Sequence, residues 1–201
     1  MNATKKILAI VGSYRKEGTV DQAVSAILAS AAECGAETSK IYLADAYIEF
    51  CTNCRTCTQG PGDCRGTCVI PDDMADVLRQ IDEADGLVLG SPVNFGDVTA
   101  LTKRFQERLV CYAYWPWDSK GFPKLRNKAK TKKAVLVTSS AAPAFLGRLM
   151  MHSLGSLKKI ADVVGAKRVG TLYIGLAGDR EPTLPQSAVK KAKALGRKLA
   201  S

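Results

Sequence analysis

The sequence predicts an α/β fold in which helices cover both faces of a five-stranded parallel sheet. Three observations predict it. Short apolar runs alternate with stretches of helical periodicity along the 201 residues. The composition, 46% apolar and 24% charged, is typical of globular proteins. No repeat, low-complexity tract or linker divides the chain, so we expect one domain over residues 1–201.

The first half of the chain supplies three strands and three helices. Residues 5–11 are a buried apolar strand stopped by Gly12, and residues 19–34 keep the 3.6-residue period of an amphipathic helix that Gly35 closes. A second strand is expected over 37–43. After a cysteine-rich insertion at about 49–70, Pro71 opens a helix over 71–84. The apolar run 86–90 is the third strand, and a helix follows over 98–111.

The second half begins with an irregular segment, residues 112–131, whose two prolines and two tryptophans favour a lid or an interface. The fourth strand is expected over 134–138, a helix over 145–164, the fifth strand over 168–174 and a basic amphipathic helix over 185–199. Five strands in alternation with helices suit the flavodoxin-like three-layer sandwich of order 2-1-3-4-5. Ligands of such sheets bind at the carboxyl ends of the strands, here at the loops 12–19, 91–97 and 139–145.

Charge is distributed unevenly. Residues 1–119 contain 11 Lys or Arg and 16 Asp or Glu, whereas residues 120–201 contain 18 and 3, within a net charge of +10. The basic part could contact an acidic protein, a phosphorylated cofactor or only solvent. No RNA-binding or DNA-reading pattern accompanies it, so nucleic acid is not an expected partner. No apolar run reaches the ~18 residues of a membrane span, and the N-terminus is not a signal peptide, so we expect a cytoplasmic protein.

The loop GSYRKEGTV, residues 12–20, joins the first strand to a helix. Backbone N–H groups at a helix N-terminus, hydroxyls and a guanidinium together make a phosphate cradle. The loop is neither the dinucleotide-binding G-x-G-x-x-G fingerprint nor a Walker P-loop. The alternative is an ordinary glycine turn, but its position after the first strand favours anion binding.

Five of the seven cysteines lie in the run CTNCRTCTQGPGDCRGTC, residues 51–68. Cys51, Cys54 and Cys57 follow at three-residue intervals, a spacing that lets one loop bring three thiolates to a [4Fe–4S] cluster. Such a cluster needs a fourth thiolate, and both Cys64 and Cys68 are available. Three other interpretations are a zinc site, dithiol redox chemistry and inert thiols. The cluster is the favoured one.

Three motifs in register now suggest a family. The loop GSYRKEGTV resembles the GSxRxxGxT/V phosphate loop of the NADPH-dependent FMN reductase branch of flavodoxin-like proteins. Residues 84–108, ADGLVLGSPVNFGDVTALTKRFQER, resemble a second segment of that branch. With CxxCxxC…CxxxDDM between them, the chain is similar to the iron–sulfur flavoproteins over roughly residues 5–175.

The resemblance implies an FMN site at the three loops. The phosphate loop would contribute Gly12, Ser13, Arg15, Gly18, Thr19 and Val20. The flavin ring would lie against Ser91, Pro92, Val93, Asn94, Phe95 and Gly96, and Ser139, Ser140 and Ala141 would close its other side. Asn94 departs from the family, which usually has Tyr there, and Phe95 is the aromatic alternative. The bland interpretation of SPVNFG is a structural loop.

The resemblance also favours Cys68 as the fourth cluster ligand, because Asp72-Asp73-Met74 follow it in the family register, with Cys64 as the alternative. It implies an FMN-dependent oxidoreductase that moves electrons between NAD(P)H or a carrier, FMN, the cluster and a small acceptor. FMN carries the chemistry, so no catalytic side chain is predicted. We expect a homo-oligomer, a dimer or tetramer. The alternatives are an electron carrier that docks an acidic ferredoxin-like protein, and a metal- or redox-sensing protein without flavin.

Other residues are assigned structural roles. His152, the only histidine, is expected to cap or pack a helix, and its isolation disfavours a hydrolase. Cys34 and Cys111 are expected to be buried as small apolar side chains. The two tryptophans, Trp115 and Trp117, could cover the flavin or pack in a subunit interface. The lysines of residues 190–198 are interpreted as a solvated helix face.

Overall fold

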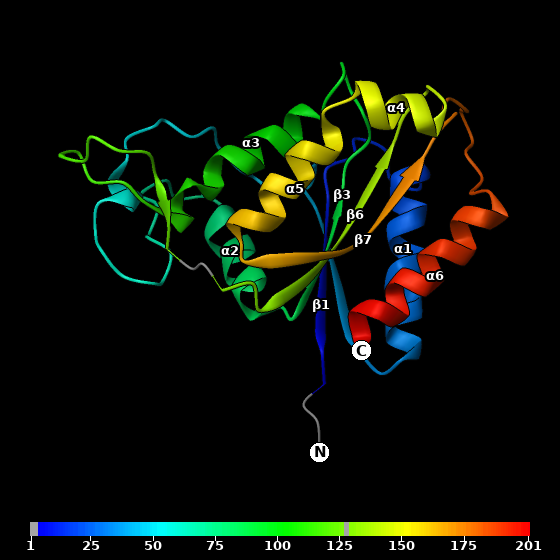
Figure 1. Ribbon diagram of the computed structural model, residues 1–201, viewed down its shortest axis with the longest axis horizontal. Helices are drawn as coiled ribbons and strands as arrows, with labels where there is room; N and C mark the ends of the chain where they lie inside the picture. The colour runs from blue at the N-terminus through cyan, green and yellow to red at the C-terminus, as the bar shows by residue number, and fades with distance from the viewer. Residues whose placement is uncertain (1–3, 127–128) are drawn as a thin grey trace.

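The computed structural model describes residues 4–126 and 129–201. Its main sheet has five parallel strands in the order β2-β1-β3-β6-β7, which confirms the predicted flavodoxin-like topology (Figure 1). The strands are β1 (Lys6–Val11), β2 (Glu37–Tyr42), β3 (Gly86–Gly90), β6 (Lys132–Ser139) and β7 (Ala166–Ile174). Because all neighbouring pairs are parallel, the carboxyl ends of the strands lie along one edge of the sheet.

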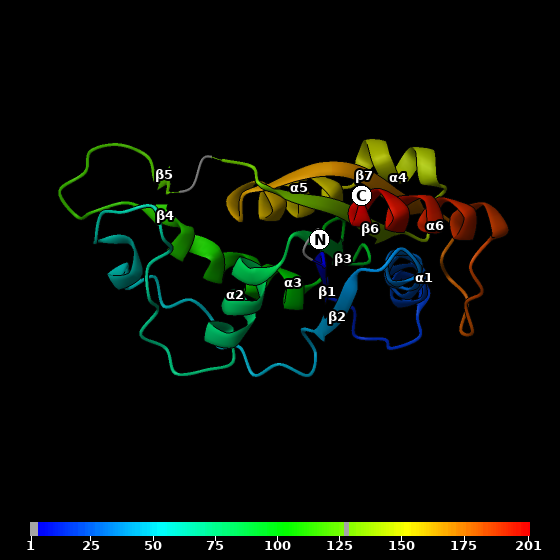
Figure 2. The ribbon, with the colours of Figure 1, turned by 90° about the horizontal axis from the view of Figure 1, so that it is seen from below.

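Helices cover both faces of the sheet, and each face has its own apolar core (Figure 2). α1 (Thr19–Glu33) and α6 (Gln186–Ala200) pack on one face, against Ile7, Ala9 and Val11 of β1. α2 (Met74–Glu83), α3 (Ala100–Arg108) and α5 (Ser153–Val163) pack on the other, against Leu8 and Ile10. This alternation follows from the period of two in a strand, and it explains why the central strands β1 and β3 are apolar on both faces.

Three helices differ from the sequence prediction. α2 begins at Met74 with Asp73 as its N-cap, three residues after Pro71, which was expected to open it. The helix expected over 145–164 is divided into α4 (Ala144–Met150) and α5, because Met151 is extended and the backbone N–H of His152 donates to the Gly96 carbonyl at 2.8 Å. The helix expected over 98–111 ends at Arg108 and continues as the 3-10 helix η2 (Leu109–Tyr112). The strands agree with prediction to within two residues. Within the described ranges, no helix is both long and apolar enough to cross a membrane.

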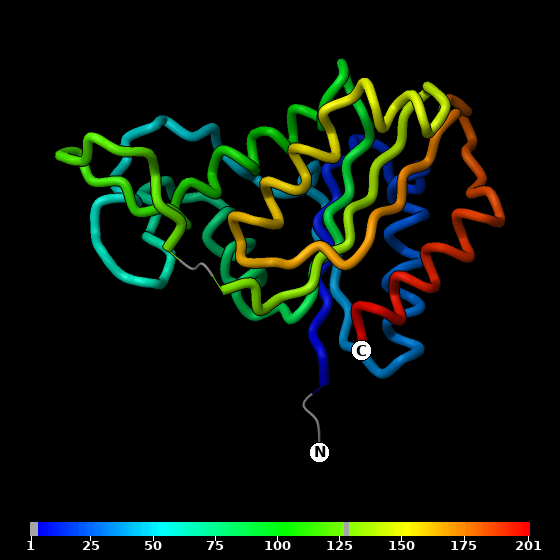
Figure 3. The backbone as a smooth tube through the Cα atoms, in the orientation of Figure 1, coloured from blue at the N-terminus to red at the C-terminus, as the bar shows by residue number. Residues whose placement is uncertain are grey.

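Residues 43–73, here called the cysteine loop, leave the sheet after β2 and return at α2. The regular structure within it is the 3-10 helix η1 (Thr56–Thr58). A second excursion carries the antiparallel strands β4 (Ala113–Tyr114) and β5 (Lys124–Leu125), inside the segment that was expected to be irregular. Residues 127 and 128 of that predicted segment lie outside the described residues. The two excursions lie side by side at one end of the molecule (Figure 3), joined by a hydrogen bond from the N–H of Trp115 to the carbonyl of Thr58.

Candidate functional site

The loops 12–19, 91–97 and 139–145, here called the carboxyl edge, follow three strands that are neighbours in the sheet. Backbone hydrogen bonds join each loop to the next strand. The N–H of Gly12 donates to the Gly90 carbonyl at 2.7 Å, and the N–H of Val93 donates to the Ser139 carbonyl at 2.7 Å. The structure therefore brings together the three segments that the sequence predicted to form one site.

Buried hydroxyls connect the first two of these loops. Thr99, the N-cap of α3, donates to the Gly12 carbonyl at 2.6 Å and shares a 3.0 Å hydrogen bond with Thr102. The Thr102 hydroxyl donates to that of Ser91 at 3.0 Å. All three side chains are buried, and a Cβ at Gly12 would lie 1.8 Å from Thr102 Oγ1. The backbone at Gly12 is thus held against α3 with no room for a side chain.

The beginning of α1 has the form of an anion site. Gly18 precedes the helix in an extended conformation and supplies no capping side chain, so the N–H groups of the first turn face the loop. The loop is held by two further contacts. The N–H of Arg15 donates to the Ser13 hydroxyl at 3.1 Å, and the N–H of Glu17, with a positive φ of 61°, donates to Asp21 at 2.8 Å.

Asp21 is buried but charged. Burial alone would raise the pKa of its carboxyl, yet the hydrogen bonds from Lys40, the Glu17 N–H and Tyr42 lower it below the usual value. The Lys40 ammonium lies 2.7 Å from the carboxylate. This cluster fixes the bend of the 12–19 loop, since the same carboxylate accepts from Lys40, Tyr42 and the loop backbone.

Two predicted phosphate-loop residues are placed differently from the others. The Val20 side chain is buried in the core between α1 and the sheet, so only its backbone can face a ligand. The Arg15 guanidinium donates to the carbonyls of Asp179 (3.4 Å) and Arg180 (2.5 Å), which fastens the 12–19 loop to the segment after β7. Thr19 is the first residue of α1, where its hydroxyl and N–H lie at the start of the helix.

The second loop forms a tight turn at its tip. Asn94 and Asp97 exchange backbone hydrogen bonds of 2.8 and 3.2 Å, and the two residues between them, Phe95 and Gly96, both have positive φ. The Phe95 ring is fully exposed at this tip. Pro92 and Val93 are partly buried below it. Phe95 is therefore the aromatic side chain that this loop presents to solvent, in place of the tyrosine that the family usually has at position 94.

The third loop is held by buried serines. The N–H of Ser140 donates to the Ile174 carbonyl at 3.0 Å, and its hydroxyl donates to the Ala142 carbonyl at 2.9 Å. Ser139 is buried as the last residue of β6, while Ala141 is exposed. Under this loop the Tyr173 hydroxyl is buried and has no hydrogen-bond partner among the described residues.

The five cysteines of the cysteine loop line two adjoining pockets, and Cys57 lines both. Cys51, Cys54, Cys57 and Cys68 line one pocket together with Arg108. Cys64 lines a neighbouring pocket with Cys57 and the glycine-rich stretch 60–66. Burial, and after it the negative charges of neighbouring Cys68, Cys51 and Cys54, raise the pKa of Cys57. Cys57 is thus close to each of the other three cysteines of this pocket.

These four residues supply the thiolate donors that a [4Fe–4S] cluster needs, and a zinc ion accepts the same donors. Among residues 4–126 and 129–201, no group of three or more His, Cys, Asp or Glu side chains is arranged to hold one metal ion. A tetrahedral zinc ion requires four sulfurs at about 2.3 Å from one centre. In a [4Fe–4S] cluster each cysteine binds its own iron, so the sulfurs stand farther apart around a larger body. The donor set is the one that such a cluster needs.

Three arginines hold the cysteine loop, and the sequence analysis singled out none of them. Arg55 lies between the rings of Trp115 and Trp117, at 3.6 and 4.1 Å from their centroids. Arg126 is buried and donates to the carbonyls of Cys57, Gly60, Gly62 and Ala113. Arg108 donates to Cys68 Sγ at 3.4 Å. The two tryptophans therefore contact the cysteine loop and not the carboxyl edge.

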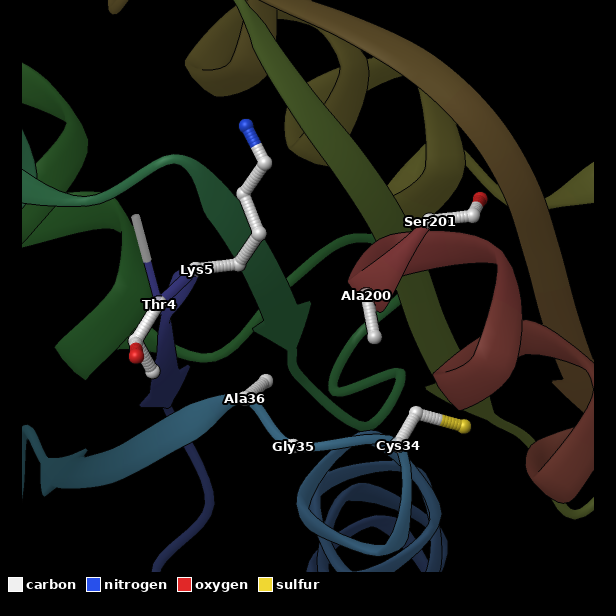
Figure 4. A pocket seen from close by; sticks show the side chains of 7 residues that line it. All are labelled: Thr4, Lys5, Cys34, Gly35, Ala36, Ala200 and Ser201. Carbon is white, nitrogen blue, oxygen red and sulfur yellow. The ribbon is translucent and has the colours of Figure 1, made fainter. Parts of the chain in front are cut away.

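A further pocket lies at the opposite edge of the sheet, where the strands begin (Figure 4). It is lined by Lys5, Cys34 and small residues at the ends of α1 and α6. Cys34 is exposed, so the prediction that it is buried was wrong; Gly35 turns the chain immediately after it and leaves the thiol at the surface. Cys111 is buried, as predicted.

Some of the missed residues left a signal in the sequence. Thr102, Phe105 and Arg108 are the buried residues of α3 and recur at three-residue spacing. A charged residue on the apolar stripe of a helix is rarely buried without a partner. His152 occupies the N-cap position of α5, as predicted, but its side chain makes no capping hydrogen bond there. Arg55 and Arg126, which also bind backbone carbonyls, left no such pattern.

Comparison of the sequence with known protein families identifies a matching family. Residues 5–177 match the sequence model of the family described as NADPH-dependent FMN reductase. An iron–sulfur flavoprotein of Methanocaldococcus jannaschii is 41% identical over 103 residues, 51% of this chain and 51% of the relative. One from Archaeoglobus fulgidus is 35% identical over 111 residues, 55% of this chain and 48% of the relative. The chain thus spans about half the length of these two curated relatives.

A second Archaeoglobus fulgidus iron–sulfur flavoprotein aligns over more of its length, at 29% identity across 96% of this chain and 93% of the relative. Among solved structures, an FMN-dependent NADH-azoreductase from Bacillus anthracis has a TM-score of 0.72 at 13% identity, covering 98% of this chain and all of the other. An NAD(P)H:quinone oxidoreductase from Methanothermobacter marburgensis has a TM-score of 0.71 at 17% identity, with the same coverage. These structural similarities show a shared fold.

Proposed function

The chain belongs to the NADPH-dependent FMN reductase family, and from that premise we propose that it is an FMN-dependent oxidoreductase that also carries a [4Fe–4S] cluster. NAD(P)H or an electron carrier is the proposed donor, and a small molecule the proposed acceptor. The observation that carries the flavin assignment is the convergence of three loops at the carboxyl edge, the first two of them joined by the Ser91, Thr99 and Thr102 hydroxyls. This is where open α/β sheets bind nucleotides.

The proposed phosphate site is the beginning of α1. The N–H groups of Thr19 and Val20 and the Thr19 hydroxyl would bind the phosphate oxygens, because a helix start without a cap leaves such donors available. The Ser13 hydroxyl donates to the Arg15 carbonyl at 3.1 Å and would turn from it to join them. Arg15 contributes positive charge and ties the loop to residues 179–180. We therefore assign the loop, and not Arg15 alone, to phosphate binding.

The proposed ring site is the loop 91–97 opposite 139–141. FMN, when bound, supplies hydride acceptance at its N5 atom. The protein's part is to orient the ring and exclude water. The rigid turn at Asn94–Asp97 and the exposed Phe95 ring would contact it from one side, and the backbone of Ser139, Ser140 and Ala141 from the other. No side chain is assigned to proton transfer.

The proposed cluster ligands are Cys51, Cys54, Cys57 and Cys68. Their shared pocket supports this choice; Cys64 lines an adjoining pocket that shares only Cys57 with the first, and it stays the alternative fourth ligand. A cluster supplies single-electron exchange, which lets a two-electron flavin communicate with one-electron carriers. The names of the curated relatives agree with this cofactor pair.

Self-association is proposed through the surface around the carboxyl edge. Around the carboxyl edge, Phe95, Phe145, Leu149, Met150 and Leu176 are exposed apolar residues. Such a group on a monomer marks a contact surface. Light scattering of the flavin-loaded protein tests this directly, and a monomer at micromolar concentration would contradict it.

An electron carrier is the second candidate, favoured by the basic part of the chain, which has 18 Lys or Arg and 3 Asp or Glu over residues 120–201. Anaerobic mixing distinguishes the two functions. We expect FMN-loaded protein to be bleached by NADPH or NADH and reoxidised by a quinone in repeated turnovers. Reduction only by a ferredoxin, slowed by salt, would favour the carrier. Protein that fails to bind added FMN would contradict both.

A further inference from the structure

Arg108, the last residue of α3, is a buried charged residue that lies beside the cysteines. Arg108 is 3% exposed, and its partner Asp72 has a fully buried side chain. The two Nη atoms of Arg108 meet the two carboxylate oxygens of Asp72 at 2.5 and 3.1 Å. This is the two-pronged geometry that arginine makes with carboxylates and that lysine cannot reproduce.

Asp72 is itself fixed by the backbone on both sides of the cysteines. Its oxygens accept from the N–H of Glu49 at 2.8 Å and from the N–H of Met74 at 3.1 Å. Burial alone would raise the pKa of Asp72, but the bonds from Arg108 and from these two N–H groups lower it, so the carboxyl is charged. Arg108 Nη1 also donates to the Glu49 carbonyl at 2.8 Å. The pair therefore fastens the two ends of the cysteine loop together.

The Arg108 guanidinium also donates a hydrogen bond to one of the cysteines. Arg108 Nη2 donates to Cys68 Sγ at 3.4 Å while it also binds Asp72. Arg108 lines the same pocket as Cys51, Cys54, Cys57 and Cys68. Its direction is set by Asp72, so the donor toward Cys68 is held in place before any ligand arrives.

We propose that Arg108, oriented by Asp72, is a positioning residue for the cluster: it holds Cys68 as the fourth ligand and raises the cluster's reduction potential by donating to that sulfur. This inference rests on the proposed function, because it requires a cluster on the four cysteines. Donors to ligand sulfurs raise the potential, since they stabilise the more negative reduced cluster. Partners of metal ligands typically contribute 10- to 100-fold to metal affinity.

The test compares anaerobically reconstituted wild type with Arg108→Lys. Lysine keeps the positive charge near Asp72 but cannot bind two oxygens and a sulfur in one plane. We expect iron loss to a chelator to be about 10-fold faster, and the cluster potential, followed by EPR-monitored redox titration, to become more negative. FMN content should be unchanged. The matched control is Arg79→Lys, which alters an exposed arginine that also binds two carboxylates, on α2.

A second variant avoids a buried unpaired charge. Arg108→Gln with Asp72→Asn removes both charges together, which is better tolerated than removing one. We expect its cluster potential to fall as well. Iron in every variant with unchanged potential and unchanged chelator kinetics would overturn the role of Arg108. Iron-free wild type that binds FMN would instead overturn the proposed cluster.

Discussion

The carboxyl edge and the cysteine loop are held by different kinds of side chain. At the carboxyl edge, neutral hydroxyls of Ser91, Thr99 and Thr102 bind one another and the backbone between the first two loops, and the charged Asp21 and Arg15 act on the 12–19 loop alone. In the cysteine loop, charged groups from outside the loop bind its carbonyls, and the loop contributes little regular structure of its own. The first site is supported by the sheet, the second by arginines.

The difference suits the two proposed cofactors. A flavin ring needs a close-fitting neutral surface and a phosphate site at a helix start, which the sheet edge supplies. A cluster bound by four thiolates is negatively charged, and guanidinium groups nearby offset that charge. Because the two sites use separate supporting residues, damage to one should leave the other intact. The following substitutions test that independence.

Gly66→Ala should have the largest effect. A Cβ at Gly66 would lie 1.8 Å from the carbonyl oxygen of Cys57, a backbone atom that cannot move without shifting a proposed cluster ligand. We expect iron content to fall close to zero and the free energy of unfolding to fall by about 3 kcal/mol, with FMN retained. Gly60→Ala, where a Cβ would meet nothing within 4 Å, is the matched control. Parallel loss of FMN would show that the sites are coupled.

Gly12→Ala is the corresponding change at the carboxyl edge. The new Cβ would collide with the buried Thr102 hydroxyl at 1.8 Å. We expect FMN affinity, measured by fluorescence titration, to weaken at least tenfold, with a stability loss of about 2 kcal/mol and normal iron content. Gly155→Ala in α5, which has open space for a Cβ, serves as control. FMN affinity equal to that of the control would remove Gly12 from the site.

Thr99→Val should have a smaller effect on the same edge. It removes the bond to the Gly12 carbonyl and the N-cap bond from the Thr102 N–H. We expect chemical denaturation to show a loss of about 1.5 kcal/mol, with weaker FMN binding. Thr38→Val on the edge strand β2 should be close to neutral. An equal loss of stability in Thr99→Val and Thr38→Val would mean that the buried hydroxyl bonds of Thr99 do not stabilise the fold.

The smallest effect is a pH dependence near the cysteine loop. Burial, followed by the charge of Cys57, raises the pKa of Cys111 from 9.0 to about 12. The folded protein keeps this thiol protonated, while the unfolded chain releases the proton above pH 9, so stability falls as pH rises. Between pH 9 and 10 we expect this thiol to account for about 1 kcal/mol of that fall. Cys111→Ala should show a shallower slope, and an identical slope would contradict this assignment.

The features that the sequence predicted are those with local causes. Runs such as residues 86–90 are buried on both faces, and the parallel order follows from their alternation with helices. The break between α4 and α5 was missed because its cause is the distant Gly96 carbonyl, which binds His152. The role of Arg108 was missed for a similar reason, since its partners lie 36 and 40 residues away along the chain. The three-residue spacing on α3 indicates that Arg108 is buried, but the sequence does not indicate which distant residues it contacts.

The central claim is that one chain holds a cluster on Cys51, Cys54, Cys57 and Cys68, apart from a flavin at the carboxyl edge. The most direct test measures iron, sulfide and FMN in anaerobically reconstituted wild type, Cys64→Ser and Cys68→Ser. We predict about four irons per chain in wild type and Cys64→Ser, and little iron in Cys68→Ser, with FMN bound by all three. Iron retained by Cys68→Ser but lost from Cys64→Ser, or a wild type with flavin and no iron, would contradict the claim.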